Sequence, residues 1–234
     1  MIEIKNVTKK YGEKKALNNV SFNVEDGEIF AFIGHNGAGK TTLIKSIVGI
    51  HDFDEGDILI NGKSIKKSPV ECKKEMAFVP DNPELYENMK AIDFINFICD
   101  MYEIDQQTRT ANITKYAKMF EIDTNLNDTI NSFSHGMKQK IALISALAHN
   151  PKILIMDEPF VGLDPKAVFD VKEIMNEMTK EGKTIFFSTH ILDVAEKLCS
   201  RVAIIKKGEL IKVGSMEEIK GDASLEKVFL ELEK

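Results

Sequence analysis

Short apolar runs of strand length alternate with segments of helical periodicity along the chain. In the first part, strands are predicted at residues 2–7, 20–24, 29–33, 56–62 and 76–79, with Gly, Asn, Asp or Pro at several of their boundaries. After the third run, Leu43, Ile44, Ile47 and Val48 have helical spacing and predict a helix over 41–50. Strands that alternate with helices predict a mostly parallel, helix-covered sheet.

The pattern changes between about Leu85 and Asp128. Apolar runs bounded by glycine disappear, and positions such as Ile92, Ile95 and Ile98 follow a helical period. We predict a helical lobe over residues 85–133. It is inserted into an α/β core made of residues 1–84 and 134–215, whose N-terminal part forms an antiparallel β-lobe.

The core pattern resumes after the helical lobe. Helices are predicted over 135–149 and from the Asp164-Pro165 cap to Gly182. Strands are predicted over 153–156, 184–188, 202–205 and 209–213. In the tail, residues 216–234, the apolar residues Leu225, Val228, Phe229 and Leu232 have helical spacing. This tail is expected to pack on the body or to meet a partner.

Composition narrows the class of protein. The 234 residues are 43% apolar, which is ample for one large domain, and the formal net charge of −6 argues against nucleic-acid binding. Three scattered cysteines suit a reducing, cytosolic setting. No apolar run approaches the ~20 residues of a membrane helix, and the N-terminus lacks a signal-peptide pattern. Any role at a membrane is expected to depend on a partner.

A glycine-rich loop follows the third predicted strand and matches the pattern G-x-x-x-x-G-K-[ST] in full. Its backbone N–H groups and the following helix N-terminus form a phosphate cradle. Lys40 would neutralise phosphate charge, and the Thr41 hydroxyl would ligate Mg²⁺. The residues assigned to this nucleotide site are Gly34, His35, Asn36, Gly37, Ala38, Gly39, Lys40, Thr41 and Thr42.

Two carboxylates, Asp157 and Glu158, end the apolar run 153–156. In open α/β sheets that end lies where ligands bind, so Asp157 can serve Mg²⁺ and Glu158 can polarise an attacking water. His190 ends another predicted strand and could orient the same water or contact the γ-phosphate. A solvated strand end and a structural histidine are the alternatives for these residues.

Together these motifs, in this order, resemble the ABC transporter ATPase cassette from Tyr11 to about Gly214. The resemblance implies that Tyr11 stacks on adenine, that Glu158 is the general base and that His190 is the switch histidine. It implies a P-loop NTPase fold and a Mg²⁺-dependent ATPase. It also implies that Asp164, in Gly162-Leu-Asp-Pro, lies in the loop through which two cassettes communicate.

The segment Ser134, His135, Gly136 and Met137 is similar to the family's L-S-G-G-Q signature, with His135 and Met137 substituted. In the family this segment contacts the γ-phosphate held by the other subunit. The expected partner is therefore a second cassette in an ATP-dependent head-to-tail homodimer or heterodimer. The substitutions indicate export.

One position departs from the family pattern. Asp81 stands where the family has a glutamine that touches Mg²⁺ and the membrane subunit. A carboxylate can bind Mg²⁺ but adds negative charge beside the triphosphate. Asp81 could instead cap a turn with Pro80.

The resulting prediction is an ATP-hydrolysing subunit on the inner face of the cell membrane, bound to separate polytopic subunits. A soluble ABC protein of ribosomes or DNA is less compatible, because those usually carry tandem cassettes or long coiled-coil insertions. A module that barely hydrolyses ATP is disfavoured by the intact Glu158 and His190.

Overall fold

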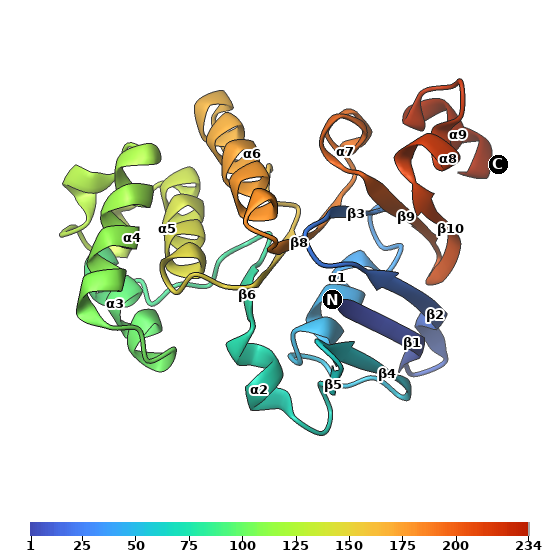
Figure 1. Ribbon diagram of the computed structural model, residues 1–234, viewed down its shortest axis with the longest axis horizontal. Helices are drawn as coiled ribbons and strands as arrows, with labels where there is room; N and C mark the ends of the chain where they lie inside the picture. Colours follow the sequence, from blue (N-terminus) through green and yellow to red (C-terminus); the bar gives the residue numbers. More distant parts are fainter. Residues whose placement is uncertain (234) are drawn as a thin grey trace.

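The larger of two β-sheets runs through the middle of the molecule (Figure 1). The computed structural model describes residues 1–233, and in them this sheet has the strand order β10-β9-β3-β8-β7-β6. Its neighbouring strands pair in parallel except for β9 with β10. The predicted mostly parallel sheet is confirmed. The strands are β3 (Ile29–Ile33), β6 (Met76–Val79), β7 (Ile153–Asp157), β8 (Thr184–Thr189), β9 (Arg201–Lys206) and β10 (Glu209–Ser215).

The smaller sheet is antiparallel, as predicted for the N-terminal β-lobe. It has the order β2-β1-β4-β5, with β1 (Ile2–Tyr11), β2 (Lys14–Val24), β4 (Glu55–Ile60) and β5 (Lys63–Ser64). The hairpin of β1 and β2 is longer than the apolar runs predicted, because its tip is solvent-exposed. There Lys10 pairs with Lys15 and Tyr11 with Lys14, so hydrophobic periodicity gives no sign of the strands.

Helices cover both faces of the larger sheet. They are α1 (Lys40–Ile47), α2 (Pro69–Lys74), α3 (Ala91–Met101), α4 (Gln106–Met119), α5 (His135–Ala148), α6 (Pro165–Lys180), α7 (Leu192–Leu198), α8 (Met216–Lys220) and α9 (Leu225–Glu233). Helices α3, α4 and α5 pack together at one end of the molecule, away from the smaller sheet (Figure 1). Lys234, the last residue of the predicted tail, lies outside the described residues. Within residues 1–233, no helix combines the length and apolar character needed to cross a membrane.

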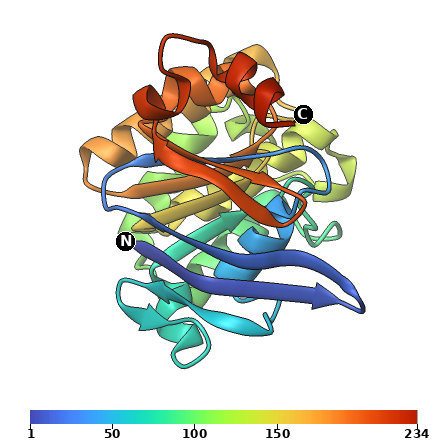
Figure 2. The same cartoon turned by 90° about the vertical axis from the view of Figure 1, so that its right-hand side faces the viewer.

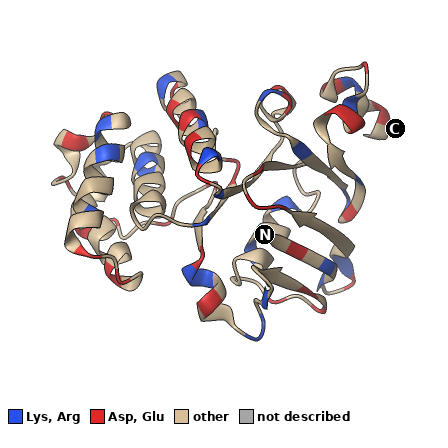
Figure 3. Ribbon diagram, viewed as in Figure 1, with Lys and Arg blue, Asp and Glu red and all other residues tan. Residues whose placement is uncertain are grey.

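Two apolar layers enclose the larger sheet because side chains alternate along each strand. In β3, Ile29, Ala31 and Ile33 belong to the layer beneath α5, α6 and the tail, whereas Phe30 and Phe32 face α1 and the smaller sheet. All five are buried. Charged side chains are almost absent from the central strands, whereas charges of both signs lie along α6 (Figure 3). A sheet buried on both faces explains the uninterrupted apolar runs.

Turn residues set the ends of the elements that lead to the site. The Asp164 carboxylate accepts a 2.8 Å hydrogen bond from Ala167 N and Pro165 follows it, which confirms the predicted start of α6. Helix α1 ends at Ile47, three residues before the predicted end. Gly49, at φ +66°, leaves the helical conformation there.

Candidate functional site

The loop between β3 and α1 folds closely onto its neighbours. A β-carbon at Gly34 would lie 2.5 Å from the carbonyl oxygen of Ile205, and one at Gly39 would lie 2.6 Å from that of Ala16. Gly39 also has φ +115°, which side-chain-bearing residues rarely adopt. Glycine is required at both positions for the loop to curl at the start of α1, so its N–H groups can surround a phosphate.

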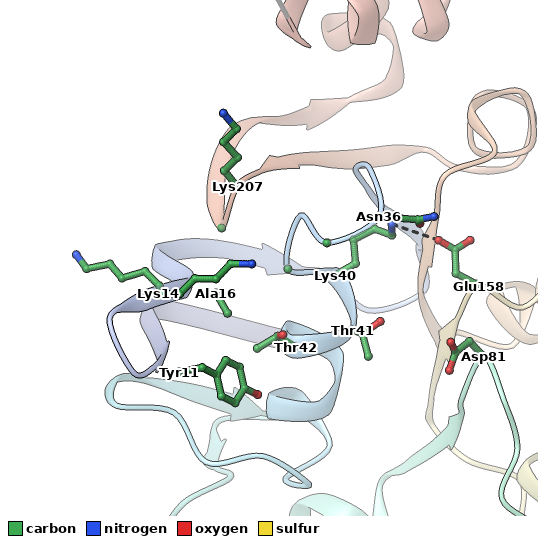
Figure 4. A pocket seen from close by; sticks show the side chains of 14 residues that line it. Tyr11, Lys14, Ala16, Asn36, Lys40, Thr41, Thr42, Asp81, Glu158 and Lys207 are labelled. Carbon is green, nitrogen blue, oxygen red and sulfur yellow. Dashed lines mark ion pairs between the residues drawn. The ribbon is translucent and has the colours of Figure 1, made fainter.

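The Lys40 amine lies inside this loop and is almost fully buried, with 6% of the residue exposed. It donates to the carbonyl oxygens of Gly34 at 2.7 Å and His35 at 3.3 Å. Glu158 Oε1 lies 3.3 Å from the same amine, and Figure 4 marks this ion pair. A buried ammonium held by two carbonyls and one carboxylate can exchange some of these contacts for phosphate oxygens.

Parallel register brings the ends of β7 and β8 together, with Asp157 paired to Ser188. The Ser188 hydroxyl donates to Asp157 Oδ1, and the nearby Thr41 side chain acts to lower the pKa of this carboxyl group. Asp157 is 1% exposed, and burial raises the pKa of its carboxyl above the ordinary value. Its Oδ2 is buried and has no hydrogen-bond partner within residues 1–233. An unpaired buried oxygen of this kind suits a cation.

Glu158 turns away from the line of β7. Its φ is +49°, and its N–H donates to both the carbonyl and the hydroxyl of Ser188 at 3.2 Å. The side chain reaches His190, whose ring Nδ1 lies 2.9 Å from Glu158 Oε2. The backbone N–H of His190 donates to the same oxygen at 3.3 Å. Lys40, Glu158 and His190 therefore form one connected chain of polar contacts. A left-handed backbone at a non-glycine residue is uncommon and often marks a functional turn.

A cavity of about 660 Å³ opens beside this chain. Figure 4 shows it framed by α1, the β1–β2 hairpin, the β9–β10 turn and the segment after β6. Tyr11, half exposed, borders it and hydrogen-bonds His51 through its hydroxyl at 2.9 Å. The predicted site residues that the cavity brings together are Tyr11, Asn36, Gly37, Gly39, Lys40, Thr41, Thr42, Asp81 and Glu158.

Sequence reasoning missed several residues of this region. The Ser188 hydroxyl donates to the Asp157 carboxylate and accepts from the backbone N–H of Glu158; it could have been found because strand register places it opposite Asp157. The remaining ones come from two turns that only the fold brings near the loop. These cavity-lining residues are Lys14, Lys15, Ala16, Lys207 and Gly208.

Metal-binding groups at this site are few. No cluster of three or more His, Cys, Asp or Glu side chains able to hold a metal occurs in the described part of the chain. Asp157, with its unpaired Oδ2, and the neighbouring Thr41 hydroxyl are oxygen ligands of the kind Mg²⁺ takes together with water and substrate phosphates. Asp81 lines the same cavity, and its carboxylate accepts from Asn82 N at 2.9 Å. The donors present fit Mg²⁺ bound with a nucleotide.

The segment 134–137 lies apart from the cavity. Ser134 caps α5 by accepting from Met137 N at 3.3 Å, and His135 borders a different hollow next to Asn82 and Lys138. Asp164 is tied to α5 by an ion pair of 2.9 Å with Lys140. The hydrogen bond from Ala167 N and this ion pair hold the pKa of Asp164 below its ordinary value. The segment 134–137 and Asp164 form a second polar surface.

Comparisons with known proteins identify the family of this chain. The model of the family described as ABC transporter matches residues 17–161, more than half of the chain. The chain therefore belongs to the ABC transporter family, as an ATP-binding component of the ATPase class that energises transport. The fold expected from the resemblance is confirmed by solved cassettes of the same architecture.

Several relatives support the assignment. The ABC-type transporter ATP-binding protein EcsA of Bacillus subtilis is 35% identical, and the match covers 100% of this chain and 97% of EcsA. The linearmycin resistance ATP-binding protein LnrL of Bacillus subtilis and the methionine import ATP-binding protein MetN of Clostridioides difficile are each 34% identical. Each match covers 94% of this chain and 70% of the relative.

Two solved structures are similar over nearly the whole chain. One, described as an ATP-binding subunit of an ABC transporter, has a TM-score of 0.96 at 33% identity, with 100% of both chains covered. The other is a dimeric post-hydrolysis state of the ATP-binding cassette MJ0796 bound to ADP and Pi. Its TM-score is 0.83 at 28% identity, with 92% of this chain and 99% of that chain covered.

Proposed function

We propose that this chain hydrolyses Mg²⁺·ATP in the cavity beside the phosphate loop, as one of two cassettes that drive export through separate membrane subunits. The observation that carries the proposal is the continuous set of contacts Lys40–Glu158–His190 at the edge of that cavity. It joins a phosphate-binding cation to a carboxylate and a histidine at adjacent strand ends.

The phosphates bind to residues 34–42. Lys40 turns from its loop carbonyls and Glu158 toward the β- and γ-phosphates, and the N–H groups of the loop donate to their oxygens. The Thr41 hydroxyl and Asp157 would hold Mg²⁺, with the cavity-lining Asp81 as a further oxygen donor. When bound, Mg²⁺ neutralises charge that develops on the phosphate oxygens. Tyr11 stacks on the adenine at the open side of the cavity.

Glu158 accepts a proton from the attacking water. Its Oε1 has no hydrogen-bond partner of suitable geometry within residues 1–233, despite the nearby Lys40 amine. Departure of Lys40 to the phosphates would free this oxygen for water. His190 holds the other oxygen through two contacts and fixes the direction of the carboxylate. These roles give His190 a positioning function for Glu158.

A second cassette completes the site. Ser134 and Gly136 lie outside the cavity formed by their own chain, at the N-terminus of α5, where a hydroxyl and helix N–H groups favour an anion. In a head-to-tail pair they would reach the γ-phosphate on the other chain, and Asp164 would lie between the two sites. The dimeric ADP- and Pi-bound cassette supports the pairing of two cassettes. The proposed pair is a homodimer or a heterodimer.

Membrane subunits are the remaining partners. The relatives are named as transporter ATP-binding proteins, and residues 1–233 hold no helix able to span a bilayer. We place the chain at the cytoplasmic face of the membrane, bound to polytopic subunits. The relatives' names include both resistance and import, so the direction rests on the signature substitutions His135 and Met137. A solute-binding protein needed for transport would contradict export.

Glu158→Gln tests the chemistry and the assembly together. The variant keeps the side-chain volume but cannot accept the proton, so ATP should bind with near wild-type affinity and steady-state turnover should be lost. Light scattering should show a dimer that forms with Mg²⁺·ATP and dissociates on its removal. Wild-type turnover in the variant would exclude Glu158 as the base, whereas a monomer saturated with ATP would exclude the second cassette.

A further inference from the structure

The first two residues of the phosphate loop lie between β9 and the tail helix α9. Gly34 lies so close to Ile205, the neighbour of Lys206 at the end of β9, that a β-carbon on Gly34 would be 2.5 Å from the Ile205 carbonyl oxygen. The ring of His35 meets the ring of Phe229 in an edge contact, with centroids 4.9 Å apart and an angle of 63° between the planes. A residue 194 positions further along the chain thus touches the ATP loop directly.

Helix α9 is held firmly enough to act as a support. Leu225 and Phe229 are buried, at 0% and 5% exposed. The N–H of Leu225 donates to Glu196 Oε2 at 2.9 Å, and Lys206 Nζ donates to the carbonyl of Leu232 at 3.0 Å. Figure 2 shows the tail helices on the side of the larger sheet opposite the smaller sheet, where α9 packs against α7.

His35 connects Phe229 to Lys40, the lysine of the phosphate loop. His35 is solvent-exposed apart from its contacts, yet its carbonyl accepts from Lys40 Nζ at 3.3 Å and from Ala38 N at 3.1 Å. Any shift of the His35 backbone therefore moves an oxygen that holds Lys40. The aromatic edge contact has a preferred geometry, which aliphatic packing would not impose.

We propose that Phe229 is a positioning residue of the ATP site, which holds His35 and thereby keeps the phosphate loop in its binding conformation. The inference rests on the proposed placement of ATP on residues 34–42. The substrate phosphates would bind to a loop that is preformed by the tail rather than ordered on binding, so loss of the contact raises the cost of binding.

If Phe229 had only a structural role, its substitution would not change the affinity for ATP. If the tail only added apolar burial, substitutions at Phe229 and at its half-buried neighbour Val228 would lower the thermal stability and leave nucleotide affinity unchanged. A positioning role predicts an effect on ATP affinity that depends on the ring at residue 229 and on the presence of His35.

The test is ATP titration of the full chain, with steady-state kinetics and thermal unfolding of each variant. Phe229→Leu keeps an apolar side chain but removes the ring, and should raise the Kd and the KM for ATP about threefold to tenfold at unchanged kcat. Phe229→Tyr, which keeps the ring, should bind like wild type. Val228→Ala is the matched control on the same helix and should change stability only.

A double-mutant cycle decides whether the effect passes through His35. His35→Ala should weaken ATP binding to a similar degree, and adding Phe229→Leu to it should cause no further loss. Additive losses, or equal affinities in Phe229→Leu and Val228→Ala, would overturn the proposal. Lys40→Ala tests the proposed placement of ATP separately from the positioning role of Phe229. Undiminished ATP binding in that variant would contradict the placement of ATP itself, whatever the tail variants show.

Discussion

His135 lies over Gly162, and the two residues join the start of α5 to the loop that leads into α6. A β-carbon on Gly162 would lie 2.6 Å from Cδ2 and 2.9 Å from Nε2 of the His135 ring. Gly162 also has φ +79°. The bulky residue in the signature-like segment is therefore accommodated by a glycine in the loop that ends at Asp164. The substitution at His135 and the glycine at 162 thus belong to one packing arrangement.

Gly162→Ala should test this arrangement. The variant carries both left-handed strain and a clash with the ring, so we expect a loss of about 2–4 kcal/mol in the free energy of unfolding. Adding His135→Ala should restore the part of the free energy of unfolding that the clash removes. The loss that remains, about 1–2 kcal/mol, should be due to the left-handed backbone strain. Urea unfolding of the four proteins of the cycle measures both.

Gly182 provides the matched control for that cycle. It has φ +80°, but a β-carbon there would meet no atom within 4 Å in the described structure. Gly182→Ala should cost about 1–2 kcal/mol, with or without His135→Ala. If His135→Ala gives the same recovery in both glycine variants, the proposed steric pairing with Gly162 is wrong.

Asp157→Asn should stabilise the nucleotide-free protein while impairing Mg²⁺-dependent ATP hydrolysis. Burial raises the pKa of Asp157, so its charged form opposes folding above that pKa and the penalty fades as the pH falls through it. For a gain of ~1 kcal/mol in the free energy of unfolding, we expect the Tm of the variant to rise by about 2–4 °C at pH 7–8. This rise should shrink toward acidic pH. Asp81→Asn, at an exposed position, should give no such increase. A gain independent of pH would contradict the burial argument.

Catalysis should depend on His190 and not on arginine. Arg109 pairs with Asp100, and Arg201 pairs with Glu28; neither lines the ATP cavity as the structure describes it. Changing both arginines to lysine should lower kcat by less than about tenfold, roughly 1.4 kcal/mol of barrier. His190→Ala should cost considerably more, because Glu158 loses both its imidazole contact and its orientation. The reverse ranking in folded proteins would refute this division of roles.

Activity per chain should rise with protein concentration, because the segment 134–137 lies outside its own cavity. Ser134→Arg should block turnover by placing bulk at the N-terminus of α5, with ATP binding by each chain retained. Ser132→Arg is a control at an exposed position just before the cap. A constant rate per chain across a dilution series in which light scattering shows monomers would exclude catalysis by a pair.

Many of the groups at the site could be predicted from short segments of the sequence. The loop 34–42 has a spacing that serves phosphate binding, and the buried run ending at Asp157 and Glu158 places carboxylates at a strand end whatever the details of packing. The N-cap at Asp164 was predictable for the same reason, since one side chain bonds a backbone group three residues away. These features depend on contacts within a few residues, so a single sequence contains them.

Contacts between distant segments were decided only by the tertiary structure. The exposed end of the β1–β2 hairpin has no hydrophobic period, so its pairing and the placement of Lys14 and Lys15 beside the ATP loop could not be read from the pattern. Helical spacing showed that the tail has an apolar face, but Phe229 met His35 only because β9 and α7 carry α9 to that point. Likewise, the substituted His135 is compatible with Gly162 only because of how the start of α5 lies against the loop before α6. Local patterns thus determined which groups are present, and the packing of the two sheets and the helices decided which of them meet.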